Sequence, residues 1–434
     1  MTATDLGAAA DVIAVVARRL AAAVHAEQES RQSVVPPQRR RALAEELISG
    51  EIRAREAGAS HAGHRAPDPE ASAALAKAVA DSLFAMGGLT HYLEMSDVEN
   101  IICFGHDRVF LRFADGRRER GGHPVAASDE DLIKLVRTVA ARAGHEERRF
   151  ERSAPSLSMQ LPDGSRLFAT MSLSPRPYLG IRRHRFPKCT LSDLVGMGTL
   201  DEGIAAFLAA AVKARLNVIV AGELGGGKTT LLRALAAEIE PGEVVVTIED
   251  AFELGLDSDG DRPVLTLQSR EPNSEDQGAY SASQLVRDAL RSCADRIIIG
   301  EIRGDEVIPA LNAMNVGNDG SLSSIHASSS LQVFSRIASC TVQSPERLGL
   351  EATNIMVANA LHLVVHLAKA PDGTRVVSSI REVVGSDGTM VCSNEIFKPG
   401  TDMRAVPATP PTGPRMEKLI AAGWDPSTFR GARR

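Results

Sequence analysis

A run of glycines followed by a lysine is the feature that most restricts how this chain can fold. Residues 218–235 read VIVAGELGGGKTTLLRAL: an apolar run, four glycines, Lys228, two threonines, and then apolar residues at helical spacing. This pattern predicts a strand before the glycines and a helix after them. Glycines remove side chains where the backbone must lie close to a ligand, and the adjacent lysine indicates that this ligand is anionic.

Residues 222–229, GELGGGKT, fit the P-loop pattern G-x-x-x-x-G-K-[ST]. In that pattern successive backbone N–H groups surround a phosphate, and the start of the following helix adds its unpaired N–H groups. The Lys228 ammonium can reach the β- and γ-phosphates, and the Thr229 hydroxyl can bind Mg²⁺. The sequence therefore predicts a site for ATP and Mg²⁺ made by Gly222, Gly225, Gly226, Gly227, Lys228, Thr229 and Thr230.

Two carboxylates and a histidine follow strand-like segments further along the chain. RIIIGE ends in Glu301, and VVVTIED places Glu249 in the same way. Because ligands of an open α/β sheet bind at the carboxyl ends of its strands, Glu301 is the first candidate for binding metal or positioning water. Glu249 is the second candidate, and capping of a neighbouring helix is the alternative for both. GSLSSIHASS places His326 similarly, as a γ-phosphate sensor or as an ordinary structural histidine.

Arginines gather around the segment RIIIGE. LVRDALR puts Arg287 and Arg291 at i, i+4 on one helix face, and Arg296 and Arg303 flank the strand itself. Arginines beside a P-loop stabilise the charge of a transferred phosphoryl group. Taken singly, each is more often a solvated surface residue, so which of them acts is left open.

Composition describes an ordinary globular chain of two or three domains, with 434 residues, 24% charged residues and a net charge of −6. Aromatic residues make up only 4%, so an aromatic platform for single-stranded nucleic acid is not expected. The five cysteines form no C-x-x-C pair, which predicts reduced thiols in place of zinc or disulfides. No apolar run is long enough to cross a bilayer, so a cytoplasmic location is expected.

The chain is expected to be α/β, and its pattern of apolar and polar residues changes from one segment to the next. An alanine-rich start predicts helices, and alternating polarity with turns at Asp115–Gly116 and Asp163–Gly164 predicts an α+β domain. Alternating strands and helices then predict a parallel-rich sheet covered on both faces. A final segment is loop-like, with a short helix near MEKLIAAG. The predicted segments are a helical region at 1–86, an α+β domain at 87–186, a linker at 187–200, the P-loop domain at 201–400 and a tail at 401–434.

The order of these motifs resembles the secretion ATPases of type II and type IV secretion systems and of pilus assembly. Within that family it is most similar to the tight-adherence (Flp) pilus ATPases of the CpaF type. The family's Walker A motif corresponds to GELGGGKTT, its aspartate box to VVTIEDAFEL, its atypical Walker B motif to DRIIIGEIRG and its histidine box to GSLSSIHASS. The resemblance covers residues 87–385 and includes the basic segment GIRRHRF.

The resemblance implies a RecA-like P-loop NTPase domain behind an α+β N-terminal domain, assembled as a homohexamer that binds ATP between its domains. It implies that Glu249 and Glu301 act in metal binding and water activation and that His326 senses the γ-phosphate. Arg182 and Arg183, with the arginines of LVRDALR, would complete the phosphate site. Hydrolysis would move the domains at the inner face of the cytoplasmic membrane, where a platform protein assembles pilin or exports protein.

The sequence departs from the family at Leu224 and Gly226, where threonine and serine are common, and at Asn318, where many relatives have histidine.

Three alternatives to the ATP hydrolase stay open. A RecA-like motor on nucleic acid is disfavoured by the low aromatic content and the negative charge. A small-molecule kinase would need a lid over its acceptor, and no segment indicates one. A nucleotide-gated scaffold that binds ATP without turnover is a further alternative, which the altered P-loop makes worth testing.

Overall fold

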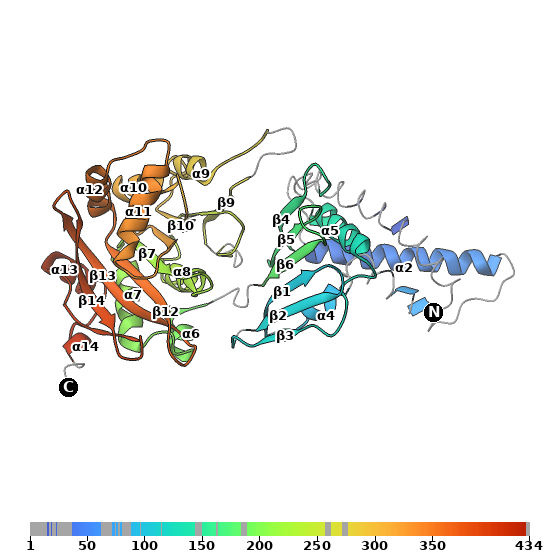
Figure 1. The fold of residues 1–434 in the computed structure, drawn as a ribbon, viewed down its shortest axis with the longest axis horizontal. Helices are drawn as coiled ribbons and strands as arrows, with labels where there is room; N and C mark the ends of the chain where they lie inside the picture. Colours follow the sequence, from blue (N-terminus) through green and yellow to red (C-terminus); the bar gives the residue numbers. More distant parts are fainter. Residues whose placement is uncertain are drawn as a thin grey trace. The chain divides into compact units, whose positions relative to one another are not determined.

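The chain divides into two compact units, residues 1–182 and 183–434, which are described separately (Figure 1). The structure is a computed structural model. It describes residues 37–61, 88–95, 97–113, 115–143, 150–161, 164–183, 189–256, 262–270 and 277–430, with a few single positions among residues 15–23 and 72–79.

The first unit contains an antiparallel sheet of six strands in the order β3-β2-β1-β6-β5-β4. Alternating apolar and polar residues give this sheet one apolar face. The helices α4 (Leu89–Leu93) and α5 (Asp129–Ala143) cover that face and share one core with it. The Asp115–Gly116 turn joins β2 to β3, whereas Asp163 lies outside the described residues. The strands are β1 (Val98–Phe104), β2 (Arg108–Phe113), β3 (Arg118–Arg120), β4 (Ser156–Gln160), β5 (Arg166–Thr170) and β6 (Tyr178–Arg182).

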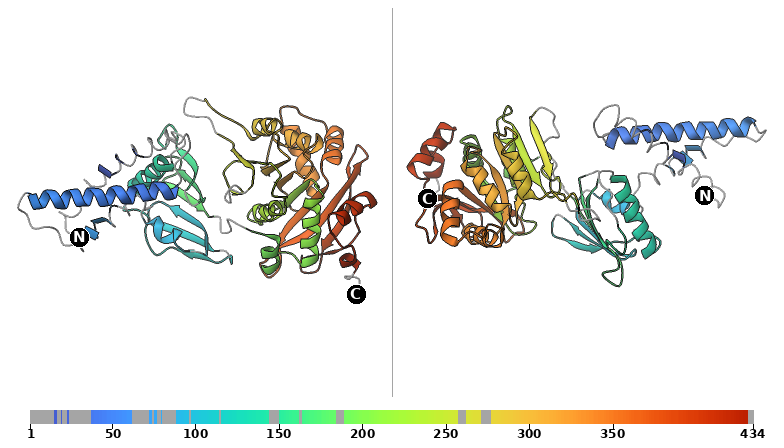
Figure 2. Two further views of the ribbon diagram at one scale, coloured as in Figure 1. Left: turned by 180° about the vertical axis from the view of Figure 1, so that it is seen from behind. Right: turned by 90° about the horizontal axis from the view of Figure 1, so that it is seen from above.

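The region expected to be helical includes one long described helix, α2 (Pro37–His61), which Figure 2 shows from two further sides. Ile48 and Ile52 of this helix are buried in a small cluster with Val16 and Val79. Of the other apolar residues expected on helices here, Val12 and Leu20 lie outside the described residues. Within the described part of the chain, none of the helices has the length and apolar character that a bilayer span requires.

The second unit is built on a nine-stranded sheet in the order β15-β14-β13-β12-β7-β11-β10-β8-β9. The strands from β12 to β9 are mutually parallel, and β13, β14 and β15 continue the sheet in antiparallel fashion. The expected α/β fold with a parallel-rich sheet is thus confirmed. Its strands are β7 (Val218–Gly222), β8 (Val245–Glu249), β9 (Val264–Gln268), β10 (Arg296–Ile302), β11 (Leu322–His326), β12 (Leu363–Lys369), β13 (Arg375–Ser386), β14 (Val391–Pro399) and β15 (Ala405–Pro407).

Helices cover both faces of this sheet. Val218 and Val220 of β7 belong to the core on one face, and Ile219 and Ala221 belong to the core on the other. Strands buried on both faces read as continuous apolar runs, which is why the P-loop is preceded by VIVA. The first core includes α6 (Leu191–Gly196), α7 (Glu202–Lys213) and α8 (Lys228–Ala237). The second includes α9 (Ala282–Ala289), α10 (Val307–Asn315), α11 (Gln332–Gln343) and α12 (Leu350–Ala360).

The C-terminal segment packs on the same sheet. Besides the expected short helix, α13 (Gly413–Ala421), it contributes strand β15 and the helical turn α14 (Ser427–Arg430). Fully buried Glu382 of β13 accepts a hydrogen bond from the Thr412 backbone at 3.0 Å and pairs with Arg415 at 3.1 Å. Trp424 is 2% exposed, and its ring lies edge-on to Phe207 of α7 at 5.4 Å. The described part of this segment, residues 401–430, is therefore a structural part of the second unit.

Candidate active site

The P-loop lies between β7 and α8, at the carboxyl end of a strand flanked by β11 and β12. Gly225 and Gly227 have φ angles of +72° and +92°, which side chains rarely allow. A Cβ on Gly222 would lie 2.8 Å from the carbonyl oxygen of Leu367 on β12, so only glycine fits there. The departure at Leu224 falls on an exposed position, 79% accessible, and leaves this backbone path unaffected.

Lys228 begins α8 and is 7% exposed. Its Nζ atom donates to the loop's own carbonyl oxygens of Gly222 and Glu223, at 3.2 and 3.0 Å. The same Nζ lies 3.0 Å from Nδ1 of His326. Because an ammonium group only donates, Nδ1 accepts this bond and the neutral imidazole carries its proton on Nε2.

His326 ends β11 and contacts Glu301 on the neighbouring strand, with Nε2 lying 2.6 Å from Oε1. Oε1 of Glu301 is buried and has no hydrogen-bond partner. Burial lowers the pKa of His326, and the nearby Glu301 carboxylate opposes this shift. At neutral pH the ring is therefore a neutral link between the Lys228 ammonium and the Glu301 carboxylate.

Glu301 lies at an irregularity of β10, where the pairing with β11 shifts between Ile299 and Ile302. Bulges of this kind change the direction of a side chain next to active sites. Arg303 donates to Oε2 of Glu301 at 2.7 Å and to Asp250 at 2.7 Å. Lys228, His326, Glu301, Arg303 and Asp250 thus form a continuous series of contacts along the strand ends, which we call the polar chain.

Glu249 is buried behind this polar chain. Its Oε1 accepts hydrogen bonds from the backbone N–H groups of Glu253 and Leu254, both at 2.9 Å, and its Oε2 has no hydrogen-bond partner. Burial raises the pKa of Glu249 to about 7, and the two backbone hydrogen bonds partly offset this. Gly300 leaves room for it, since a Cβ there would lie 3.2 Å from Cγ of Glu249. The contacts of Glu249 therefore fix the turn that follows β8.

That turn presents Glu253, a residue that the sequence did not single out. Its Oε2 lies 3.2 Å from the Thr229 hydroxyl, which donates to it. Buried Arg233 donates to the carbonyl oxygens of Glu253 and Leu254 and holds the turn against α8. The aspartate-box resemblance covered Glu253, but only the fold reveals that it faces Thr229.

The remaining predicted arginines have other contacts. Arg287 lies on α9 and donates to Glu346 at 3.1 Å. Arg291 lies in the turn after α9, which ends at Ala289, so the two arginines do not share a helix face as the sequence predicted; Arg291 donates to Asp288 at 3.2 Å. Arg182 ends β6 with its side chain exposed, and Arg183 follows it at the start of the second unit.

Arg296 lies at the opposite end of β10 from Glu301. It is 1% exposed and donates two hydrogen bonds to Glu243, at 2.7 and 2.8 Å. These contacts stabilise the core, and they place Arg296 away from the group of arginines that the sequence associated with phosphate.

The donor groups at the P-loop suit a nucleotide with magnesium. The Thr229 hydroxyl and the carboxylates of Glu253 and Glu301 are hard oxygen ligands of the kind that Mg²⁺ prefers. Glu249 and Glu301, on two neighbouring strands, each have one buried oxygen atom without a hydrogen bond. Among the described residues no cluster of three or more metal ligands is preformed, and Mg²⁺ usually binds through one or two carboxylates together with substrate phosphates.

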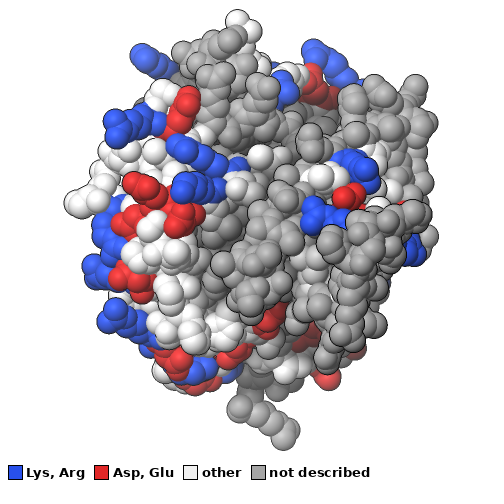
Figure 3. All heavy atoms as spheres, turned by 90° about the vertical axis from the view of Figure 1, so that its right-hand side faces the viewer, with Lys and Arg blue, Asp and Glu red and all other residues white. Residues whose placement is uncertain are grey.

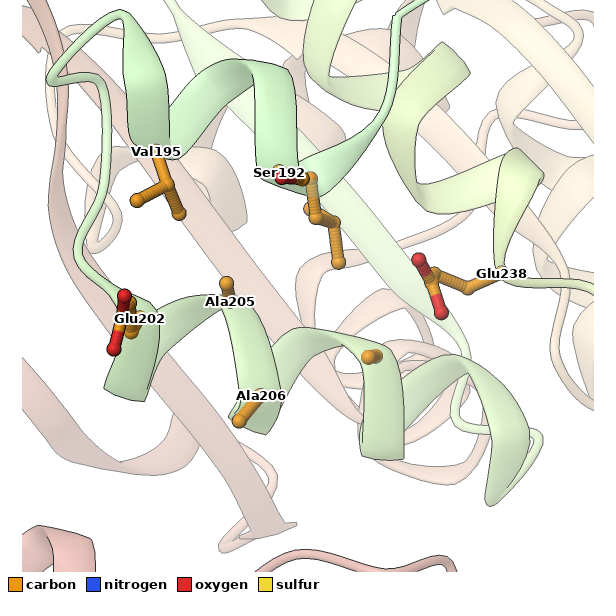
Figure 4. A pocket seen from close by; sticks show the side chains of 8 residues that line it. Ser192, Val195, Glu202, Ala205, Ala206 and Glu238 are labelled. Atoms are coloured by element: carbon orange, nitrogen blue, oxygen red, sulfur yellow. The ribbon is translucent and has the colours of Figure 1, made fainter.

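A separate shallow pocket lies between α6 and α7 (Figure 4). Ser192 and Val195 of α6 face Ala205 of α7, and Glu238 lies beside them. Glu238 caps the end of α8, about 15 Å from its start at Lys228. The pocket offers no phosphate-binding group, so it is not the nucleotide site.

Comparisons with known proteins agree on one family. A family model described as type II/IV secretion system protein matches residues 122–406. A putative conjugal transfer protein of Mycobacterium tuberculosis (strain CDC 1551 / Oshkosh) is 30% identical over 70% of this chain and 85% of its own length. The type IV secretion system protein PtlH of Bordetella pertussis (strain Tohama I) is 37% identical over 37% of this chain and 47% of its own length.

Two solved structures are also similar to this chain. The VirB11 ATPase of the Brucella suis type IV secretion system, in complex with sulphate, is 27% identical in sequence. The match covers 68% of this chain and 91% of the VirB11 chain, with a TM-score of 0.37. The pilus retraction motor PilT with bound ADP is 16% identical in sequence. The match covers 77% of this chain and 85% of the PilT chain, with a TM-score of 0.48.

Proposed function

The chain belongs to the type II/IV secretion system protein family, and from this premise we propose that it is an ATP hydrolase powering pilus assembly or protein secretion. The observation that carries the proposal is the polar chain beside the P-loop. It brings a phosphate-binding lysine, a histidine and a strand-end carboxylate into contact, although they come from three separate segments of the sequence.

The residues take distinct roles in this proposal. The P-loop N–H groups and Lys228 bind the phosphates, and Thr229, Glu301 and Glu253 hold Mg²⁺. When bound, Mg²⁺ neutralises charge on the phosphate oxygens. Glu301 orients or deprotonates the attacking water, and His326 links the phosphate site to this carboxylate because it already contacts Lys228 as well.

Lys228 must exchange the carbonyl oxygens of its own loop for phosphate oxygens when nucleotide binds. His326 would then lose its contact with Lys228 and keep its contact with Glu301. Glu249 would act by fixing the turn that carries Glu253, since its Oε1 is occupied by two backbone groups. Arg182, Arg183, Arg287 and Arg291 would complete the phosphate site, some of them from a neighbouring subunit.

The wider setting follows from the family resemblance. We propose a homohexameric ring at the inner face of the cytoplasmic membrane that acts on a platform protein, in a machine of the tight-adherence pilus type. A ring is required if arginines from one subunit complete the site of the next. A fully active monomer at low protein concentration would refute the ring.

Steady-state phosphate release tests the hydrolase. We expect Glu301→Gln to lower turnover by about a hundredfold or more while calorimetry still detects binding of ATP with magnesium. Glu395→Gln on β14 is the matched control, and we expect it to keep normal turnover. Wild-type protein that binds ATP without releasing phosphate would favour the nucleotide-gated scaffold instead.

A motor on nucleic acid is the second candidate, because a relative that matches most of this chain is described as a putative conjugal transfer protein. Phosphate release with and without single-stranded or duplex DNA separates the two. Stimulation that declines steeply with salt would favour the nucleic-acid motor, because phosphate contacts release counterions. Unchanged turnover would favour secretion.

A further inference from the structure

The sheet of the first unit has one face that no described helix covers. Directly paired residues of antiparallel strands point to the same face, so the register identifies its members. They alternate with buried residues such as Ile101 and Leu179. We call this the open face, and its three cross-strand rows are Arg118–Arg112–Asn100–Arg182–Arg166–Gln160, Arg120–Phe110–Ile102–Gly180–Phe168–Ser158 and Arg108–Phe104–Tyr178–Thr170–Ser156.

Four aromatic rings lie together on the open face. Phe104 lies edge-on to Phe110 at 5.9 Å and to Tyr178 at 5.4 Å, and Phe168 lies 6.2 Å from Tyr178. Phe104 and Phe168 are 44% and 45% exposed, which is costly for rings that have no partner. The rings come from four adjacent strands and extend over about 14 Å across the sheet.

Arginines of β2 and β3 border these rings. Within the described part of the chain, Arg108, Arg112, Arg118 and Arg120 make no ion pair, and the three rows contain no aspartate or glutamate. On the side of the molecule that Figure 3 shows, Lys and Arg are interspersed with Asp and Glu. The open face therefore combines exposed aromatic rings with the positive charge of the arginines.

We propose that the open face binds single-stranded nucleic acid, with bases stacked on the rings and backbone phosphates on the arginines. Sheets that carry exposed aromatic residues bind two or three unstacked bases in this way, and the arginines supply the sequence-independent attraction. The low aromatic content of the chain predicts no such platform, but four of the sixteen aromatic side chains lie on this one sheet face.

A protein partner fits the open face less well. A second copy of this chain, with its net charge of −6, would need an acidic and apolar surface opposite at least four arginines. Nucleic acid supplies a negative charge at each nucleotide and an apolar base next to it, which matches the alternation of arginine and ring across the rows. Duplex DNA hides its base faces, so it should bind more weakly.

Filter binding of labelled oligothymidylate to the full-length protein tests the proposal without ATP. We expect the double variant Phe104→Ala/Phe168→Ala to bind at least about 25-fold more weakly, since each lost stacking contact costs about fivefold or more. Tyr280→Ala, which removes an exposed ring from the second unit, is the matched control and should bind like wild type. Unchanged binding by the double variant would overturn the proposal.

Arg112→Gln/Arg118→Gln tests the charge while avoiding Arg182, which has a proposed nucleotide contact. We expect the dependence of log affinity on log salt to become shallower by about 1.4, as for two lost phosphate contacts to a single strand. Equal binding of duplex and single strand would overturn stacking, and so would an altered sedimentation of the aromatic variant without loss of oligothymidylate affinity, which would assign the face to a second copy. Because turnover is not measured, failure here leaves the hydrolase proposal intact.

Discussion

The two units contain sheets that use their residues differently. In the first unit successive strand residues alternate between a core and an open face, so side chains in the middle of strands are accessible to ligands. In the second unit both faces of β7 and β8 are buried, so only strand ends and loops can carry chemistry. Covering a sheet on both faces therefore moves function to its edge, and leaving one face uncovered allows function across its surface.

The largest expected effect is on chemistry at a strand end. Lys228→Ala should lower ATP turnover by at least about a hundredfold, because it removes the cation that binds the terminal phosphates. Oligothymidylate binding by the first unit should stay unchanged. Phosphate release and filter binding on the same preparation measure both, and near-normal hydrolysis would mean that the P-loop is not the catalytic site.

Paired truncations test the difference in burial. Ile101→Ala should lower the free energy of unfolding of the first unit by about 3 kcal/mol, and its neighbour Ile102→Ala by less than about 1 kcal/mol. In the second unit Ile219→Ala and Val220→Ala should both cost about 2 kcal/mol or more, because both are fully buried. Urea unfolding measures these values, and equal losses at 101 and 102 would mean that the open face is covered.

The raised pKa of Glu249 predicts a pH dependence specific to the second unit. The folded protein holds this proton more tightly than the unfolded chain, so stability is lost as pH rises from about 4.5 to about 7, by up to about 3 kcal/mol. Glu249→Gln keeps an oxygen for the two backbone N–H groups and removes the ionisation. The variant should gain stability relative to wild type over this pH range, and a constant difference would mean that Glu249 titrates normally.

The smallest effect concerns the boundary between the units. Residues 187–200 are predicted as a linker, yet they contain α6, which begins with a capping box between Thr190 and Asp193. Thr190→Ala should lower the free energy of unfolding of the second unit by about 1 kcal/mol, because α6 belongs to its core. Calorimetry of the variant decides this, since no change would indicate that α6 acts only as a connection.

The sequence predicts the centre of the second unit well, because its buried strands are short runs of mostly apolar or small residues that end at glycine, glutamate or histidine. VIVAG, VVTIE, RIIIGE and LSSIH are all strands of the parallel sheet. It does not predict β15, since Pro407 and nearby glycines indicate a loop, although proline is tolerated on an edge strand.

Part of the site requires the fold. Glu253 lies in a turn without periodicity, and only the hydrogen bonds to Glu249 bring it to Thr229. The roles of the predicted arginines, of His326 and of the two glutamates stay predictions. The open face was not predicted from the sequence for a different reason. Composition is an average over the whole chain, whereas strand pairing brings Phe104, Phe168 and Tyr178 together on one face of the sheet.

Trp424 has a practical consequence. It is the single tryptophan of the chain, and it lies in the core of the second unit against Phe207. Indole emission therefore reports on that unit alone, and its red shift marks the moment when the C-terminal segment leaves the nine-stranded sheet. Tryptophan fluorescence can therefore be used to measure unfolding of the second unit separately from that of the first.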